Sequence, residues 1–201
     1  MADPGSLDEA VARMCRGDGD AFRVVYRTVQ APLLRYLEVL VGPNDAEDVA
    51  SETWGQACRD LDRFTGDADG FRGWVTTIGR HRALDLLRQR SRRIRADQDL
   101  TGVDPADSVD TEGAMLEGFT TGAALAVIRS LPRDQAEAVM LRAVMGLDAK
   151  TAGAVLGKRP GAVRSAAHRG LTTLARRLES RPASLVEVRD TFVPPGAEGV
   201  R

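Results

Sequence analysis

The sequence has little cysteine and histidine, with only two of each among its 201 residues. Two cysteines are too few for a disulfide framework or a four-ligand zinc site, and only His81 and His168 could supplement them. We therefore expect Cys15 and Cys58 to be small buried thiols in a reducing cytosol. The sequence predicts no metal and no other cofactor.

Aromatic side chains make up only 4% of the chain, whereas glycine and alanine are abundant. This composition argues against a β-sandwich or barrel, which depends on aromatic and β-branched strands, and it favours a mostly helical protein. Long apolar runs are missing as well, because none approaches the roughly 18 residues that cross a bilayer. A secretory signal has a basic stretch followed by an apolar one, whereas residues 1–20 are rich in acids. We therefore expect a cytoplasmic protein.

Charge nearly balances overall, at −1, but it is strongly segregated along the chain. Residues 1–71 hold 14 acids and 7 Arg (−7), and residues 72–95 hold 8 Arg and one acid (+7). Residues 96–123 hold seven acids and no base (−7), and residues 124–181 hold 11 bases and 4 acids (+7). Two equal basic blocks around an acidic stretch favour two polyanion-binding modules over the alternative, two solvated helix faces.

We expect an all-α protein with two small helical domains joined by an acidic flexible linker. The first domain covers residues 1–95, the linker 96–119, the second domain 120–181 and a tail 182–201. One hypothesis is that the acidic linker folds back on a basic surface when no polyanion is present, which would be autoinhibition by internal charge pairing.

Hydrophobic periodicity and capping residues predict helices along most of the chain. Ser6 and Glu9 have the spacing of a capping box. Pro32 is expected to kink or restart the second helix, and Pro132 separates two helices in the second half. The expected helices cover residues 7–16, 20–40, 45–61, 71–93, 115–129, 133–145, 148–156 and 160–178.

Residues 148–177 match the plan of a helix-turn-helix, with a short helix, a tight turn around Gly157 and a longer basic helix that would enter the major groove. An ordinary helical hairpin with a solvated basic face is the alternative. The stripe expected to pack consists of Val163, Ala167, Leu171, Leu174 and Leu178. The side chains expected at bases or phosphates are Lys158, Arg159, Arg164, Ser165, His168, Arg169 and Arg176.

The basic helix of residues 72–95 lies next to Phe71, Trp74 and Phe64. Aromatic side chains beside a cationic track suit unpaired bases, because stacking contributes about 1–3 kcal/mol per base. Taken alone, Phe71 and Trp74 are more often core residues. His81 lies among the arginines, where we expect a polar DNA or packing contact rather than a metal.

No pattern in the sequence supports catalysis, so we do not expect an enzyme. A phosphate-binding glycine loop, a nucleophile elbow and a His-Glu-x-x-His motif are all missing. The acids Asp45, Glu47 and Asp48 could ligate a metal, but at the first turn of a helix they are better explained by the helix dipole or by a basic partner.

Two groups of motifs together resemble the extracytoplasmic-function (ECF) sigma factors of bacterial RNA polymerase. The motifs similar to region 2 of that family are DAEDVASETW at 45–54, DRF at 62–64, FRGWV at 71–75 and RHRALD at 80–85. The motifs similar to region 4 are LP at 131–132, MGL at 145–147, VLG at 155–157, GAVRS at 161–165 and HRGL at 168–171.

The resemblance implies an initiation subunit that binds core RNA polymerase and promoter DNA and that an anti-sigma factor commonly holds inactive. The polymerase contacts would be the clamp helices of the largest subunit and the flap. The residues implied to dock on the clamp helices are Asp45, Glu47, Asp48 and Glu52. The residues implied to melt the minus-10 element and hold its non-template strand are Phe64, Phe71, Arg72, Trp74, Arg80, His81, Arg82 and Arg88. The residues implied to bind the minus-35 duplex are Lys158, Arg159, Arg164, Ser165, His168, Arg169 and Arg176.

Two other functions stay open at this point. A stand-alone helix-turn-helix regulator would normally dimerise to span two half-sites, but the sequence shows no dimerisation heptads and the second basic block would be unexplained. A sigma-like adaptor could bind polymerase or an inhibitor without initiating transcription.

Overall fold

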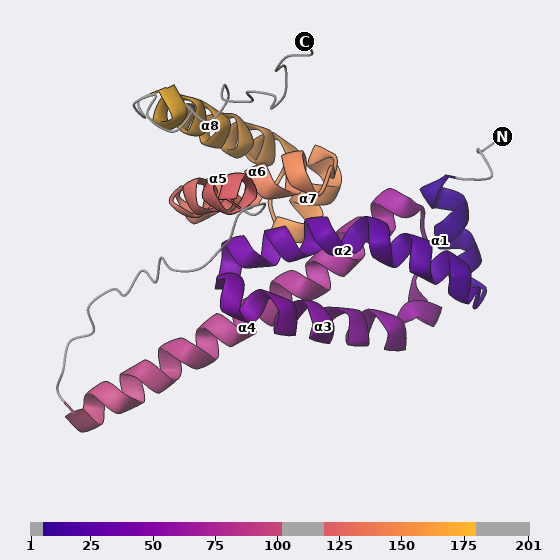
Figure 1. Cartoon of the computed structure of the whole chain (residues 1–201), viewed down its shortest axis with the longest axis horizontal. Coiled ribbons are helices and arrows are strands. Elements are labelled where there is room, and N and C mark those ends of the chain that lie inside the picture. Colours follow the sequence, from indigo (N-terminus) through magenta and orange to yellow (C-terminus); the bar gives the residue numbers. More distant parts are fainter. Residues whose placement is uncertain (1–5, 102–118, 180–201) are drawn as a thin grey trace, which may run out of the picture.

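The computed structural model describes residues 6–101 and 119–179, with side chains described for residues 6–95 and 122–177. Every regular element in these two ranges is helical, which confirms the all-α prediction. The helices form two bundles that pack against each other, one from the first range and one from the second (Figure 1).

The first bundle is built around its second helix, which packs against the other three. Its last helix begins earlier and ends later than predicted, and its distal half projects away from both bundles (Figure 1). The helix therefore continues into the segment that we assigned to the linker. The elements are α1 (Leu7–Cys15), α2 (Gly19–Val41), α3 (Pro43–Arg59), the short 3-10 helix η1 (Leu61–Arg63) and α4 (Ala68–Thr101).

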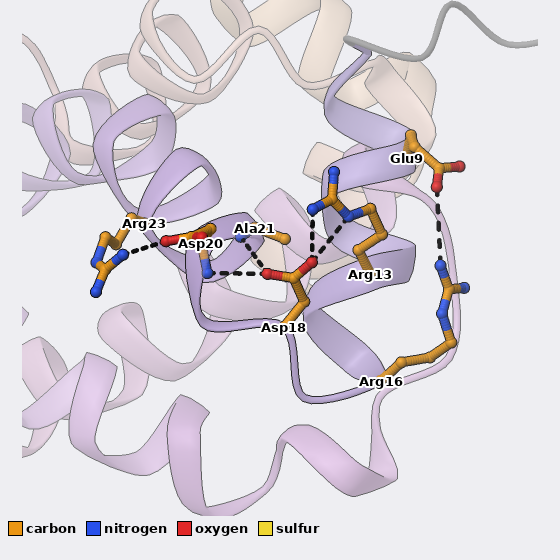
Figure 2. A network of polar contacts seen from close by, with 7 residues as sticks. All are labelled: Glu9, Arg13, Arg16, Asp18, Asp20, Ala21 and Arg23. Atoms are coloured by element: carbon orange, nitrogen blue, oxygen red, sulfur yellow. Dashed lines mark hydrogen bonds and ion pairs between the residues drawn. The ribbon is translucent and has the colours of Figure 1, made fainter.

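A polar network fixes the turn between α1 and α2 (Figure 2). Asp18 caps α2, since its Oδ1 accepts hydrogen bonds from the backbone N–H groups of Asp20 and Ala21 at 2.9 and 3.0 Å. Its Oδ2 accepts two more from the Arg13 guanidinium on α1. The Ala21 N–H and Arg13 together hold the pKa of Asp18 below its ordinary value. At the other end of α1, Ser6 caps the helix as predicted.

Pro32 lies inside α2 without ending it. The helix therefore does not restart at this residue, which was one of the two effects predicted for it. A proline removes one backbone donor and crowds the preceding turn, but it does not forbid a helix whose two halves are both held by packing. Here the buried Val29 and Leu33 flank Pro32 and anchor the helix on either side.

The second bundle contains the predicted helix-turn-helix. Asp148 caps its first helix, and Gly157 ends that helix in the left-handed conformation with φ of 64°, both as predicted. The preceding helix winds into a π turn, which the periodicity did not predict, before Gly146 at φ of 67° ends it. The elements are α5 (Phe119–Arg129), α6 (Arg133–Val139), the π turn η2 (Met140–Val144), α7 (Ala149–Leu156) and α8 (Pro160–Glu179).

The packed face of α8 differs from the predicted stripe. Leu171 is 50% exposed, whereas Ala166 and Gly170 are buried beside Val163 and Ala167. Small residues on this face let α8 approach α6 closely, because a Cβ at Gly170 would lie 2.6 Å from Cγ2 of Val139 on α6. At 3.6 residues per turn, Leu171 lies about 80° around the helix from Val163, whereas Gly170 lies within about 20° of it, so Leu171 falls outside the packed face. Leu178 lies outside the residues whose side chains are described.

The larger of two apolar clusters among the described residues runs through both bundles. Leu33 and Leu37 of α2 belong to the same cluster of buried side chains as Met140, Leu141 and Leu147 of the second bundle. The two domains therefore share an interior in this structure. The prediction of buried thiols is wrong, since Cys15 and Cys58 are both exposed.

The close approach of α6 and α8 predicts that Gly170→Ala lowers the free energy of unfolding by about 1–3 kcal/mol, because the added methyl group has no room. Gly161→Ala on the same helix is the matched control, since its Cβ would meet only the Arg164 guanidinium at 3.9 Å. Urea unfolding followed by circular dichroism measures both. Equal stability of the two variants would contradict the close packing.

Candidate nucleic-acid and polymerase interfaces

The outer face of α8 carries a row of exposed polar side chains. Pro160 stands at the first position of this helix, where its missing N–H costs no hydrogen bond. Residues three and four positions apart share a helix face, so the predicted base-reading residues come together on one side. These exposed residues are Arg164, Ser165, His168, Arg169 and Arg176.

The turn before α8 is held in a fixed shape. The N–H of Lys158 donates to the carbonyl of Gly153, and a Cβ at Gly153 would lie 2.6 Å from the Lys158 carbonyl oxygen. The Nζ of Lys158 forms an ion pair with Asp134 of α6 at 2.5 Å, so it is engaged within the protein. Arg159 is exposed.

The predicted polymerase residues lie along α3, with its apolar side turned to the core. Glu47, Asp48 and Glu52 are exposed. Asp45 is only 19% exposed at its side chain and forms an ion pair with Arg90 of α4 at 2.5 Å. Glu52 also lies 3.9 Å from Nη1 of Arg82 on α4, so the acidic face open to a partner consists mainly of Glu47 and Asp48, with Glu52 exposed beside them.

An aromatic cluster lies where η1 leads into α4. Phe71 is 1% exposed, so it belongs to the core and supports its neighbours rather than presenting a surface. Phe64 and Trp74 are half-buried, and their rings lie 5.2 Å apart between centroids. Both also contact the ring of Phe71, at 5.3 and 5.7 Å. The two outer rings are the part of the cluster that a nucleotide base could reach.

The arginines of α4 are divided between different neighbours. Arg82 donates to Oε1 of Gln56 on α3 at 3.1 and 2.8 Å, and Arg88 pairs with Asp85 on its own helix. His81 is exposed. Two other predicted minus-10 residues, Arg72 and Arg80, instead contact the second bundle.

Arg72 and Arg80 reach the second bundle in different ways. Nη1 of Arg72 donates to the backbone carbonyl of Met145 at 3.2 Å. Arg80 binds Glu137 of α6, with its Nε 2.6 Å from Oε2 and its Nη2 3.4 Å from Oε1. Burial disfavours the charge of Arg80, but its bonds to Glu137 prevail and raise the pKa of Arg80.

Glu137 and Tyr36 are residues that the sequence analysis missed. The Glu137 side chain is only 3% exposed, and its Oε2 also accepts the hydroxyl of buried Tyr36 at 3.1 Å. The pKa of the Tyr36 phenol is raised well above its ordinary value. Burial is the largest cause, and repulsion from Glu137 is the second. The only sequence signal was a lone acid within the apolar run of residues 136–141.

A groove of about 610 Å³ lies beside this contact, between the distal half of α4 and the start of α6. Its floor includes Leu84 and Leu87, and its walls are mostly basic. The basic side chains that line it are Arg80, Arg88, Arg92, Arg95 and Arg133.

The part of the chain that the structure describes contains no cluster of three or more histidine, cysteine, aspartate or glutamate residues able to hold a metal. None of its helices is both long and apolar enough to span a membrane.

Comparison with protein families assigns both halves of the chain. Residues 25–93 match the family Sigma-70 region 2, and residues 121–174 match the family Sigma-70, region 4. The ECF RNA polymerase sigma factor BldN of Streptomyces coelicolor is 33% identical over 180 residues, which cover 88% of this chain and 67% of BldN. ShbA of Streptomyces griseus, another ECF sigma factor, is 32% identical over 82% of this chain and 91% of its own length.

Solved structures show the same fold. The sigma factor RpoE in its complex with the anti-sigma factor NepR from Bartonella quintana superposes with a TM-score of 0.64 at 25% identity, covering 79% of this chain and 97% of that one. CnrH in complex with the cytosolic domain of CnrY superposes with a TM-score of 0.60 at 23% identity, covering 87% and 98%.

The chain therefore belongs to the ECF subfamily of RNA polymerase sigma factors. The first bundle corresponds to region 2 and the second to region 4. It is an alternative sigma factor, which acts with core RNA polymerase to start transcription at promoters, and not a stand-alone helix-turn-helix regulator.

Proposed function

We propose that this sigma factor divides promoter recognition between two surfaces, with α4 and its aromatic cluster holding a separated strand and α8 reading an intact duplex. The observation that carries the proposal is that each bundle has its own polar surface. One places the Phe64 and Trp74 rings beside a basic helix, and the other presents an unobstructed row of side chains on the recognition helix.

The surface of region 2 suits melted DNA. Opening a duplex costs stacking energy, and capture of an unpaired base against an aromatic ring offsets that cost. Trp74 and Phe64 would supply the rings, and Phe71 would support them from the core. The cationic and polar residues that would follow the strand backbone are Arg72, Arg80, His81, Arg82 and Arg88.

The surface of region 4 suits the minus-35 duplex. The N-terminal half of a recognition helix meets the base edges in the major groove, and arginine can bond both acceptors of a guanine. Arg164, Ser165, His168 and Arg169 occupy that half of α8. Arg159 and Arg176 at the two ends of the helix would bind phosphates, which position the protein without reading sequence. Lys158 would join them by exchanging its ion pair with Asp134 for a phosphate.

The acidic face of α3 would bind core polymerase at the clamp helices, and region 4 would contact the flap. Carboxylates there complement a basic partner and steer its approach. Because RpoE was solved in complex with the anti-sigma factor NepR, we propose an anti-sigma partner for this protein too. It would act in the cytoplasm and perform no catalysis of its own.

Run-off transcription on genomic fragments tests the function as a whole. Core RNA polymerase with this protein should give start sites that vanish when the protein is left out. Identical transcripts with and without the protein would contradict an initiating role.

We predict that Trp74→Ala lowers the yield of open complex by about tenfold or more while polymerase binding stays intact, because one stacked base contributes about 1–3 kcal/mol. Permanganate reactivity of thymines in the bubble measures opening. Trp74→Phe, which keeps a ring, should restore most of it. Normal reactivity in the alanine variant would reject the stacking role.

Arg164→Ala should relax the preference at one minus-35 position by about 1–3 kcal/mol, since a bidentate contact to guanine is lost. Fluorescence anisotropy with single-base promoter variants measures the preference. Arg159→Ala is the contrasting variant, expected to weaken binding to all variants alike because it removes a phosphate contact. Uniform weakening by Arg164→Ala would refute base reading.

Asp48→Arg should weaken binding to core polymerase at least about tenfold, because a like charge would face the basic partner. Asp20→Arg provides the control, as it makes the same charge change at an exposed position on a different helix, α2. Equal affinities of the two variants in a pull-down titration would remove α3 from the polymerase interface.

A further inference from the structure

Glu137 joins the two regions through a buried carboxylate with donors on both sides. From region 2, Tyr36 of α2 and Arg80 of α4 donate to it, at 3.1 Å and 2.6 Å for the shorter Arg80 bond. From region 4 itself, Arg133 donates to Oε1 at 2.9 Å. Both carboxylate oxygens are therefore bonded, as burial of a charge requires.

A second contact lies farther toward the start of α4. Gly73 packs directly under Thr151 of α7, since a Cβ at Gly73 would lie 2.4 Å from Thr151 Cγ2. Next to it, Arg72 donates to the Met145 carbonyl. Region 4 thus covers the side of α4 that runs from Arg72 to Arg80, a length of about two helical turns.

These contacts compete with the proposed role of α4. A guanidinium bonded to Glu137 or to a backbone carbonyl cannot at the same time bind a DNA phosphate or base through the same N–H groups. Arg72 and Arg80 are therefore engaged within the protein when the two regions are closed. The half-buried Phe64 and Trp74 rings pack against each other and against Phe71 of region 2.

We propose that Glu137, Tyr36 and Arg80 form an autoinhibitory latch, which holds region 4 on the strand-binding side of α4 until the two regions separate. The latch lies beside apolar side chains that both regions bury, so separation of the regions exposes apolar surface and has to be offset by contacts with polymerase and DNA. A buried ion pair adds little net stability over an apolar contact but fixes one arrangement, and Glu137 and Arg80 both regain water when the regions part.

The latch is tested by the distance between the regions in the free, full-length protein. Cys15→Ser leaves Cys58 of α3 as the exposed native thiol, and Thr172→Cys adds an exposed thiol on α8. One dye is then on α3 of the first bundle and the other on α8 of the second, so the pair reports closure by single-molecule energy transfer.

Glu137→Gln should lower the ratio of closed to open molecules about tenfold or more, because it removes the charge that binds Arg80 but keeps the shape of the side chain. Tyr36→Phe should lower it by a smaller factor. Arg133→Gln is the matched control, since Arg133 pairs with Glu137 within α6 and spans no junction. An unchanged distribution in Glu137→Gln, with circular dichroism showing a folded protein, would overturn the latch.

A steric variant tests the same closure without changing any charge. Gly73→Ala should open the protein because its methyl group would clash with Thr151. The double variant with Thr151→Ala should close again, since the Cβ atoms of the two alanines would then be 4.0 Å apart, an ordinary contact. Gly73→Ala molecules that stay closed would contradict the close approach of α4 and α7.

The inhibitory effect rests on the proposed strand-binding role of α4. A DNA probe distinguishes the closure of the two regions from the binding of a single strand by α4. A fluorescein-labelled single strand of 20 random nucleotides should bind unlabelled Glu137→Gln about tenfold more tightly than wild type. If Glu137→Gln opens but binds no more tightly, the strand-binding assignment of α4 fails and inhibition with it, while transcription with core polymerase still tests the sigma function separately.

Discussion

One buried carboxylate determines how the two halves of this sigma factor meet. Glu137 is charged and almost fully buried, so it needs donors that replace water, and the nearest are Arg133 on its own helix and Tyr36 and Arg80 on region 2. The apolar core that both regions share brings these groups within reach. The arrangement of the promoter-binding surfaces in the free protein follows from that contact.

Helix caps and close helix packing within each region hold the residues of this junction in place. The cap at Asp18 fixes α1 on α2, and the small residues of α8 bring it close to α6. Because α6 carries Glu137 and α8 carries the recognition face, the packing of these two helices couples the junction to the minus-35 surface. On region 2, α4 carries both Arg80 and Trp74, so one helix takes part in the junction and in the aromatic cluster.

Features encoded in neighbouring residues could be predicted from the sequence. Ser6 and Asp148 predicted helix starts, Gly157 predicted a helix end, and the charge blocks predicted two basic surfaces. Features that depend on distant residues could not. Glu137 lies 101 residues from Tyr36 and 57 from Arg80, and no local pattern pairs them.

The wrong expectations have the same origin. Leu171 fits an i+4 apolar stripe, but that spacing drifts around the helix, and the face that packs on α6 is the one with Val163 and Gly170. A restart of the helix at Pro32 was one of two predicted effects, and it was judged without the packing of Val29 and Leu33. The roles of the individual DNA and polymerase residues stay predictions, since they depend on partners that the chain alone does not contain.

The distance between regions 2 and 4 can be measured before and after assembly with core polymerase and promoter DNA, and it tests the role of the junction most directly. With the same pair of dyes on α3 and α8, the free protein should show the short distance of the closed arrangement, and the open promoter complex should show a longer one. The same distance in both states would contradict the claim that the junction at Glu137 must separate for Arg72 and Arg80 to reach DNA.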